Sequence, residues 1–223
     1  MLALAAAVFN VQAQNAAQNG QAAGGDAAAG ATKAQMCIGC HGIVGYQASF
    51  PEVYKVPMIA GQSAKYIFAS LNAYKKGERK HPTMRAIAGS LSDADMADLA
   101  AYYEKRGTEF GQPVPEGPAA APSAEVAALL NKGNCASCHG TNFSKPIDPS
   151  YPKLSGQHAD YLFAALRAYG TEGKAQHGRA NAIMAGQVKN FRRDELKAIA
   201  NYLSTLPSEL HTAPRSEFRQ ASR

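Results

Sequence analysis

Apolar residues in this chain recur at helical spacing, and no run alternates convincingly as a half-buried strand does. Ile67, Leu71 and Tyr74 follow an i, i+4, i+7 pattern, and the same pattern returns 95 residues later. This spacing places the apolar side chains on one face of an amphipathic helix. We therefore predict an all-α fold.

A second type of helix is predicted near the end of each half. In the first half it opens at Ser92-Asp93-Ala94-Asp95, a capping pattern, and carries Met96, Leu99 and Tyr103 on one face. The second half has the same apolar face but has Arg192 where the first has Ser92. The start of that helix is less well marked.

The two halves are copies of one domain. Pro57-Met58-Ile59-Ala60-Gly61-Gln62 falls on Pro152-Lys153-Leu154-Ser155-Gly156-Gln157 at an offset of 95 residues, and an offset of 100 matches the segments that follow. A chain of 223 residues has room for two small domains. We predict two tandem helical domains.

The segments outside the repeat differ in composition. The start resembles the apolar region and cleavage site of a signal peptide, without the positive n-region, and it is too short to span a bilayer. In chain order we expect a signal peptide at 1–13, a flexible lead-in at 14–31, domain one at 32–106, a Pro-rich linker at 107–123, domain two at 124–207 and a polar, disordered tail at 208–223.

Two Cys-x-x-Cys-His pentads, Cys37–His41 and Cys135–His139, use all four cysteines of the chain. This is the signature of covalent c-type haem attachment. Two thiols on one helical turn can form thioethers with the two vinyl groups, and the next His can reach the iron. We therefore predict two haems c, each enclosed by short helices. Their expected attachment residues and proximal ligands are Cys37, Cys40 and His41 in one domain and Cys135, Cys138 and His139 in the other.

A zinc site and a redox dithiol are the alternative interpretations. Four thiolates could bind one zinc ion. That explains neither the His after each pair nor the glycines that follow, Gly42 and Gly140. A redox dithiol would need an α/β context, and this sequence is helical.

The sixth iron ligand should occupy the same place in both repeats. Met84 and Met184 meet this condition, 43 and 45 residues after the His of their pentad. The thioether of Met suits a haem iron. The remaining methionines after residue 30 have no Met at the matching position and are expected in cores or on the surface: Met36, Met58 and Met96.

Histidine is the rival sixth ligand. The histidines outside the pentads lack a His partner in the other repeat and are expected in loops or on the surface: His81, His158, His177 and His211. His81 is close enough along the chain to replace Met84 in an alkaline form.

Three further matched features have expected roles. Arg79 and Arg179 each precede the Met by five residues and suit a haem propionate, with a solvated surface role equally open. Aromatic residues at matched helical positions are expected to line cores rather than to relay electrons. The Gly-Gln pair in each half predicts a turn before a helix.

Taken together, Cys-x-x-Cys-His-Gly, Pro-x-x-x-Gly-Gln-x-x-x-Tyr, Arg-x-x-x-x-Met and a terminal Ala-x-Tyr, all present twice, resemble the dihaem cytochrome c4 family over residues 32–206. The resemblance implies two packed class I cytochrome c domains. It also implies electron carriage in a respiratory chain toward a membrane-bound terminal oxidase.

Charge and ligation complete the expected function. The net charge is +6, and each domain holds ten Lys/Arg residues against six acidic ones, so we expect a redox partner with an acidic docking surface and at most a loose membrane association, with no nucleic acid bound. Covalent haem attachment needs an oxidising compartment, which indicates the periplasm. If both axial positions of each iron are filled by side chains, no site is left for a small-molecule substrate. We therefore expect an electron carrier and not an enzyme. A dihaem peroxidase and a cytochrome subunit of a flavin-containing sulfide dehydrogenase or another dehydrogenase are the alternatives.

Overall fold

The fold is described from a computed structural model of the chain, which places residues 24–110, 113–117, 119–171 and 176–214. The expected signal peptide at 1–13 and the first part of the expected lead-in lie outside these residues. The all-α prediction is confirmed, because the strands of the described part of the chain are two-residue segments.

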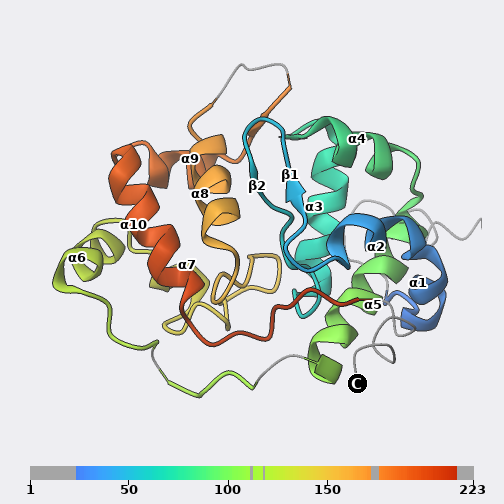
Figure 1. Ribbon diagram of the computed structural model, residues 1–223, viewed down its shortest axis with the longest axis horizontal. Coiled ribbons are helices and arrows are strands. Elements are labelled where there is room, and N and C mark those ends of the chain that lie inside the picture. The colour runs from blue at the N-terminus through green and yellow to red at the C-terminus, as the bar shows by residue number, and fades with distance from the viewer. Residues whose placement is uncertain (1–23, 111–112, 118, 172–175, 215–223) are drawn as a thin grey trace, which may run out of the picture.

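The first domain packs its helices around its longest one, α5, on which α1 and α3 lie, while α4 lies on α3. Figure 1 shows this domain on the right. Its elements are α1 (Ala27–Lys33), α2 (Gln35–His41), β1 (Gln47–Ala48), β2 (Tyr54–Lys55), α3 (Ala64–Lys76), β3 (Arg79–Lys80), α4 (Pro82–Gly89) and α5 (Asp93–Phe110).

The second domain, on the left of Figure 1, repeats the order of the helices, with α10 packed on α8 and α6. Its elements are α6 (Ala124–Lys132), α7 (Ala136–His139), α8 (Ala159–Ala168), β4 (Gly178–Arg179), α9 (Ala182–Val188) and α10 (Arg193–Ser204). The matched apolar faces of the two halves therefore form matched cores.

The predicted helix starts are present in both domains. Before α5, the Ser92 hydroxyl accepts from the Asp95 N–H at 3.1 Å and the Asp95 carboxylate accepts from the Ser92 N–H at 3.0 Å. Before α10, the Glu195 carboxylate accepts from the Arg192 N–H at 2.7 Å. The less well marked second start is thus capped from inside the helix, which still satisfies one of the free N–H groups.

Two methionines that were expected in a core or on the surface lie in such places. Met96 is fully buried in the core of the first domain, together with Leu99 and Tyr103. Met36 is exposed on the surface. Neither position supports a role as an iron ligand shared by the two domains.

A pair of short strands joins the domains. β3 of the first domain pairs antiparallel with β4 of the second, with Arg79 opposite Arg179. The Ala180 N–H donates to the Glu78 carbonyl at 2.7 Å beside this pair. A second link is an ion pair in which Arg167 of α8 contacts both carboxylate oxygens of Glu52 at 2.7 Å. Equivalent segments of the two repeats therefore face each other across the interface at β3 and β4.

Two expected boundaries between segments are wrong. Helix α1 begins at Ala27, inside the expected flexible lead-in, because it packs on α5 and the Asp26 carboxylate caps it by accepting from the Ala28 N–H. Helix α5 continues to Phe110, four residues into the expected linker. Gly107 permits its close packing, since a Cβ there would lie 2.2 Å from the Cα of Gly61.

The expected disordered tail is wrong for residues 208–214, which pack on the rest of the chain, while residues 215–223 lie outside the described residues. Figure 1 shows this segment leaving α10 and crossing to the first domain. The His211 N–H donates to the Ala60 carbonyl at 3.1 Å, and Ala213 is buried in the core of the first domain. Burial of Leu210 and Ala213 supplies the apolar contacts that hold a largely polar segment in place.

Candidate haem-binding sites

Each pentad lies at the end of a short helix, with its His as the last helical residue. Helix α2 carries Cys37, Cys40 and His41, and α7 carries Cys138 and His139 directly after Cys135. All four thiols are free of disulfides. The two thiols and the imidazole of each pentad are therefore available together on one turn.

The imidazoles of both pentads are oriented by a proline carbonyl. The Nδ1 of His41 lies 2.9 Å from the oxygen of Pro57, and the Nδ1 of His139 lies 3.1 Å from the oxygen of Pro152. A carbonyl oxygen only accepts, so Nδ1 carries the proton and Nε2 is left as the ligand atom.

The protonation state of both imidazoles also suits a metal ligand. Burial lowers the pKa of His41 and of His139, and the hydrogen bond to the proline carbonyl only partly opposes this. A lowered pKa favours the neutral imidazole at pH 7. The neutral form is the one that binds a metal.

The two candidate sixth ligands occupy equivalent, capped helix starts. Met84 is the third residue of α4 and Met184 the third residue of α9. The Met84 N–H donates to Nδ1 of His81 at 3.4 Å, and the Met184 N–H donates to Oδ1 of Asn181 at 2.9 Å. His81 and Asn181 are therefore both helix N-caps, which explains why a His in one repeat matches an Asn in the other.

The other histidines lie in loops or beside a helix start. His81 and His177 each contact the ring of Phe50 edge-on, with centroids 6.4 and 6.2 Å apart. His158 precedes α8, and Nδ1 of His211 lies 3.1 Å from the Glu209 carbonyl. Their places match the expected loop positions.

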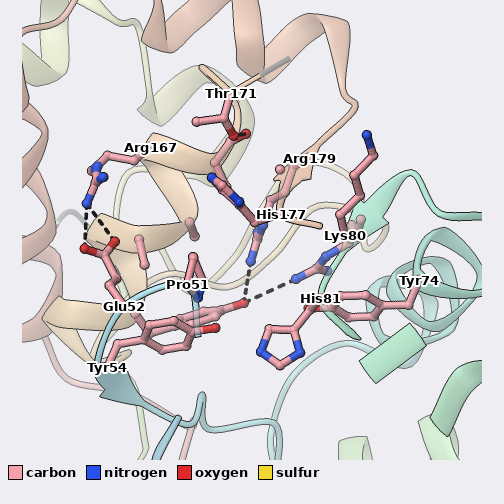
Figure 2. Close-up of a pocket in the computed structure, with 16 residues that line it drawn as sticks. Pro51, Glu52, Tyr54, Tyr74, Lys80, His81, Arg167, Thr171, His177 and Arg179 are labelled. Carbon is pink, nitrogen blue, oxygen red and sulfur yellow. Dashed lines mark hydrogen bonds and ion pairs between the residues drawn. The ribbon is translucent and has the colours of Figure 1, made fainter. Parts of the chain in front are cut away.

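The matched arginines meet at the domain interface instead of facing solvent separately. Arg79 donates to the hydroxyls of Ser70 at 2.6 Å and of Tyr161 at 3.3 Å, and Arg179 donates to Tyr161 at 2.9 Å. Figure 2 shows Arg179 reaching into a pocket whose wall also holds Tyr74 and His81. The solvated surface role is therefore wrong for both arginines.

The arginine pair fits an anionic part of the cofactor. Within the described residues, the partners of both guanidinium groups are hydroxyls and aromatic rings, with no carboxylate among them, and the Arg79 Nε is buried without a hydrogen-bond partner. Two adjacent cations need a counter-anion. The propionate carboxylates of the haems would supply it, so the residues present fit haems whose propionates these two arginines hold.

Several tyrosines expected in the cores belong to this interface. The hydroxyls of Tyr66 and Tyr161 accept hydrogen bonds from Arg79. The rings of Tyr74 and Tyr169 lie 4.7 and 5.4 Å from the guanidinium carbons of Arg79 and Arg179. Helical periodicity identifies a buried face but not the polar group that the ring meets there.

The turns predicted at both Gly-Gln pairs are present, but the role of the glutamines was missed. Gly61 and Gly156 have φ values of +88° and +68°. Their N–H groups donate to matched carbonyls at the last helix of their own domain, Tyr103 at 2.9 Å and Leu203 at 2.8 Å. The side chains of Gln62 and Gln157, however, cross to the opposite domain. Their repetition in the two halves was the available signal, since a turn alone does not require glutamine.

The fold and the two pentads define a dihaem c-type cytochrome. The Cytochrome c family profile matches residues 27–105 and 123–207. Cytochrome c4 of Azotobacter vinelandii is 32% identical over 195 residues, which cover 82% of this chain and 90% of the relative.

A solved structure agrees with this assignment. The cytochrome c4 structure of Acidithiobacillus ferrooxidans superposes with a TM-score of 0.59 at 28% identity, covering 78% of this chain and 99% of the other.

Another relative by sequence is a thiosulfate dehydrogenase electron acceptor of Stutzerimonas stutzeri. It is 31% identical to this chain, and the match covers 79% of this chain and 82% of the relative.

The chain belongs to the cytochrome c family, as a dihaem cytochrome of the c4 type. It is an electron-transfer protein with two covalently bound haems c. Among the described residues, no helix is both long and apolar enough to cross a membrane.

Proposed function

We propose that this protein is a periplasmic electron carrier in which both irons have a His and a Met as axial ligands. Cys37 and Cys40 would hold one haem between His41 and Met84, and Cys135 and Cys138 would hold the other between His139 and Met184. The observation that carries this proposal is the matched geometry of the repeats. In each, a carbonyl fixes the proximal imidazole, and a capped helix presents one Met.

The haem iron supplies a one-electron ferric–ferrous couple, which Met/His ligation places at high potential. The protein's part is to keep the ligands in place in both oxidation states. The orienting carbonyls stop the imidazoles from rotating, and the caps hold the first turns of α4 and α9. With His41, Met84, His139 and Met184 holding the two irons, no ligand position would remain for a substrate, and the electron transfer would be outer-sphere.

Arg79 and Arg179 would bind the propionates at the interface. Both arginines lie where β3 pairs with β4, so they would hold the two cofactors at the boundary between the domains. An electron entering one domain would then leave through the other over a short path. The domain interface would serve as the internal step of the carrier.

The surface supports encounter with an acidic redox protein. The net charge of +6 attracts a negatively charged partner at long range. Exposed apolar side chains lie close after each pentad in the sequence, with Val44 79% and Ile147 71% exposed. A basic surface with local apolar contacts suits a fast and transient complex, such as one with a terminal oxidase of a respiratory chain.

A second candidate function is service to one dehydrogenase as its dedicated electron acceptor. It is favoured by the relatives named thiosulfate dehydrogenase electron acceptor. The chemistry within this chain would be the same, and the difference lies in the donor. Co-purification of a dehydrogenase with the native protein would favour this candidate over a free carrier, and a flavin in that dehydrogenase would indicate the sulfide-oxidising type.

The test is the spectrum of the ferric protein against its measured haem content. The weak sulfur-to-iron charge-transfer band should have the intensity of two Met-ligated haems per chain. Met84→Ala and Met184→Ala should each remove half of it. If the band of the wild-type protein has the intensity of only one Met-ligated haem, or is missing, and a high-spin component is present, the proposal is contradicted and a peroxidase is favoured.

A further inference from the structure

Two buried glutamines tie each domain to the backbone of the other. Gln62 and Gln157 are each only 4% exposed. The Gln157 side chain accepts from the Met58 N–H at 3.0 Å and donates to the Met58 carbonyl at 2.8 Å. The Gln62 side chain accepts from the Lys153 N–H at 2.9 Å and donates to the Lys153 carbonyl at 3.0 Å. Met58 and Lys153 are themselves matched positions of the repeat.

These contacts end at the peptide groups that orient the proximal histidines. The Pro57 carbonyl and the Met58 N–H belong to one peptide group. Its oxygen accepts from His41 at 2.9 Å, while its N–H donates to Gln157 at 3.0 Å. One peptide group thus connects an expected iron ligand of the first domain to a side chain of the second.

The second domain has the reciprocal arrangement. The Pro152 carbonyl accepts from His139 at 3.1 Å, and the Lys153 N–H of the same peptide group donates to Gln62 at 2.9 Å. Each proximal histidine is therefore two hydrogen bonds away from a glutamine of the opposite domain.

We propose that Gln62 and Gln157 are positioning residues that set the reduction potential of the haem in the opposite domain. Gln157 acts on the first haem through the peptide group of Pro57 and Met58, and Gln62 acts on the second through that of Pro152 and Lys153. This inference rests on the proposed ligation of the irons by His41 and His139.

The direction of the effect follows from polarisation of the peptide group. When an N–H donates to a glutamine oxygen, electron density shifts toward the carbonyl of the same peptide, which becomes a better acceptor. The carbonyl then draws the Nδ1 proton of the histidine more strongly and raises the basicity of the ligand. A more basic imidazole stabilises the ferric state over the ferrous state. The intact relay therefore lowers the potential of its haem.

Glutamine suits this role because one amide must both accept and donate. An ionised glutamate in its place could accept from the N–H but could not donate to the neighbouring carbonyl. Each glutamine oxygen also accepts from the next N–H of its own chain, that of Ser63 at 3.1 Å or of His158 at 3.0 Å. The oxygen and the nitrogen of each amide are therefore both hydrogen-bonded, which fixes its orientation.

The test is the reduction potential of each haem in the Gln157→Met variant, measured on the haem-loaded protein. Methionine keeps the length of the side chain and removes both of its hydrogen bonds to Met58, together with the one that it accepts from the His158 N–H. We expect the equilibrium constant for one-electron reduction of the first haem to rise by about two- to fivefold, where tenfold equals 59 mV. The second haem should change less. NMR signals of the Met84 and Met184 methyl groups, followed during oxidation, assign each potential to its domain.

The sign of the shift separates the relay from a loosened interface. Water entering a loosened interface would stabilise the more highly charged ferric haems and lower both potentials. The Gln62→Met variant should show the mirror pattern, with the second haem shifted upward. Ser63→Ala is the matched control, because it removes a part-buried 2.6 Å hydrogen bond from the Ser63 hydroxyl to the Pro149 carbonyl across the same interface and keeps the backbone N–H that contacts Gln62. It should leave both potentials unchanged.

Equal shifts at both haems, a shift confined to the haem of the mutated domain, or no shift would overturn the proposal. If the Gln157→Met variant does not fold, the Gln157→Glu variant is used instead. The measurement is then the NMR resonance of the Nδ1 proton of each proximal histidine in the reduced protein. The His41 resonance should move downfield, and the His139 resonance should stay unchanged. A wild-type spectrum without Met84 and Met184 ligation would contradict the proposed function instead, so the two failures are distinguishable.

Discussion

Arg79 lies directly opposite Arg179 in the two-residue strand pair that joins the domains, and both donate to the hydroxyl of Tyr161. Like charges directly opposite in an antiparallel pair destabilise it. Nearby anions would reverse the sign of this contribution. The arrangement is therefore understandable as half of a charge-neutral cluster that the haem propionates complete.

The first prediction concerns the charge of this pair. Arg179→Gln should lower the reduction potentials, because a lost cation leaves a propionate uncompensated and favours the ferric state. The expected effect is on the order of 1 kcal/mol for the loss of one unit charge at an effective dielectric constant of about 20. Protein-film voltammetry measures it. Arg85→Gln, on the exposed side of α4, should have a smaller effect, since solvent screens that charge.

The second prediction concerns the ionisation of Tyr161. Burial alone raises its pKa, but the positive charges of Arg179 and Arg79 outweigh burial and lower the pKa to about 8. Propionates bound to the same arginines would cancel this effect. The haem-loaded protein should therefore show no tyrosine that titrates near pH 8.

Two measurements check this second prediction. The ultraviolet difference titration between wild type and Tyr161→Phe should be silent from pH 7 to 9. A Tyr161 that ionised with a pKa of about 8 when folded and of about 10 when unfolded would make the free energy of unfolding increase between these pH values. Such an increase, absent from Tyr161→Phe, would mean that the arginines do not hold the propionates.

The third prediction concerns the helix caps beside the methionines. Asn181→Ala removes the acceptor for the Met184 N–H and should destabilise the start of α9 by about 1 kcal/mol. Met184 should then leave its iron at a lower denaturant concentration, while Met84 should be unaffected. The sulfur-to-iron band, measured during a denaturant titration, reports both.

The fourth prediction uses the equivalent cap in the first domain. His81→Asn keeps an acceptor for the Met84 N–H, so ligation by Met84 at neutral pH should be unchanged. The same variant removes the His expected to replace Met84 at high pH. A spectral change at high pH that persists in His81→Asn would exclude His81 as the replacing ligand. Alanine is a poorer test here, because it removes the cap as well.

The fifth prediction compares two glycines with positive φ. Gly45 has a φ of +75° and open space where a Cβ would stand, so Gly45→Ala should cost about 1–2 kcal/mol from backbone strain. At Gly61, with a φ of +88°, the new Cβ would also lie 2.3 Å from the Glu209 carbonyl oxygen. Gly61→Ala should cost about 1–3 kcal/mol more. Thermal unfolding of both variants measures the difference, and equal losses would contradict the ordered C-terminal segment.

The extent of sequence-based prediction differed between local and long-range features. The helices, the capped start at Ser92 and the core position of Met96 followed from periodicity and capping, which are local properties of the chain. The tail was predicted wrongly for the opposite reason. Its polar composition indicated disorder, but Leu210 and Ala213 are buried by residues far away in the sequence.

Repetition allowed part of the candidate site to be predicted. It selected Met84 and Met184 over the other methionines, and it marked Arg79 and Arg179 as a pair with one role. It could not indicate that the two arginines face each other, because a repeat does not specify the axis that relates its copies. For the same reason the glutamines were interpreted as parts of turns.

The sequence by itself determined the two covalent haem motifs, the duplicated helical domain and the candidate ligands, because these depend on residue types and spacings within one copy. Only the tertiary structure decided how the copies meet. Its antiparallel contact of β3 with β4 sets Arg79 against Arg179, and the same interface directs Gln62 and Gln157 into opposite domains. These relationships join residues about 90 to 100 positions apart, and packing of the two surfaces, not local backbone preference, brings them together.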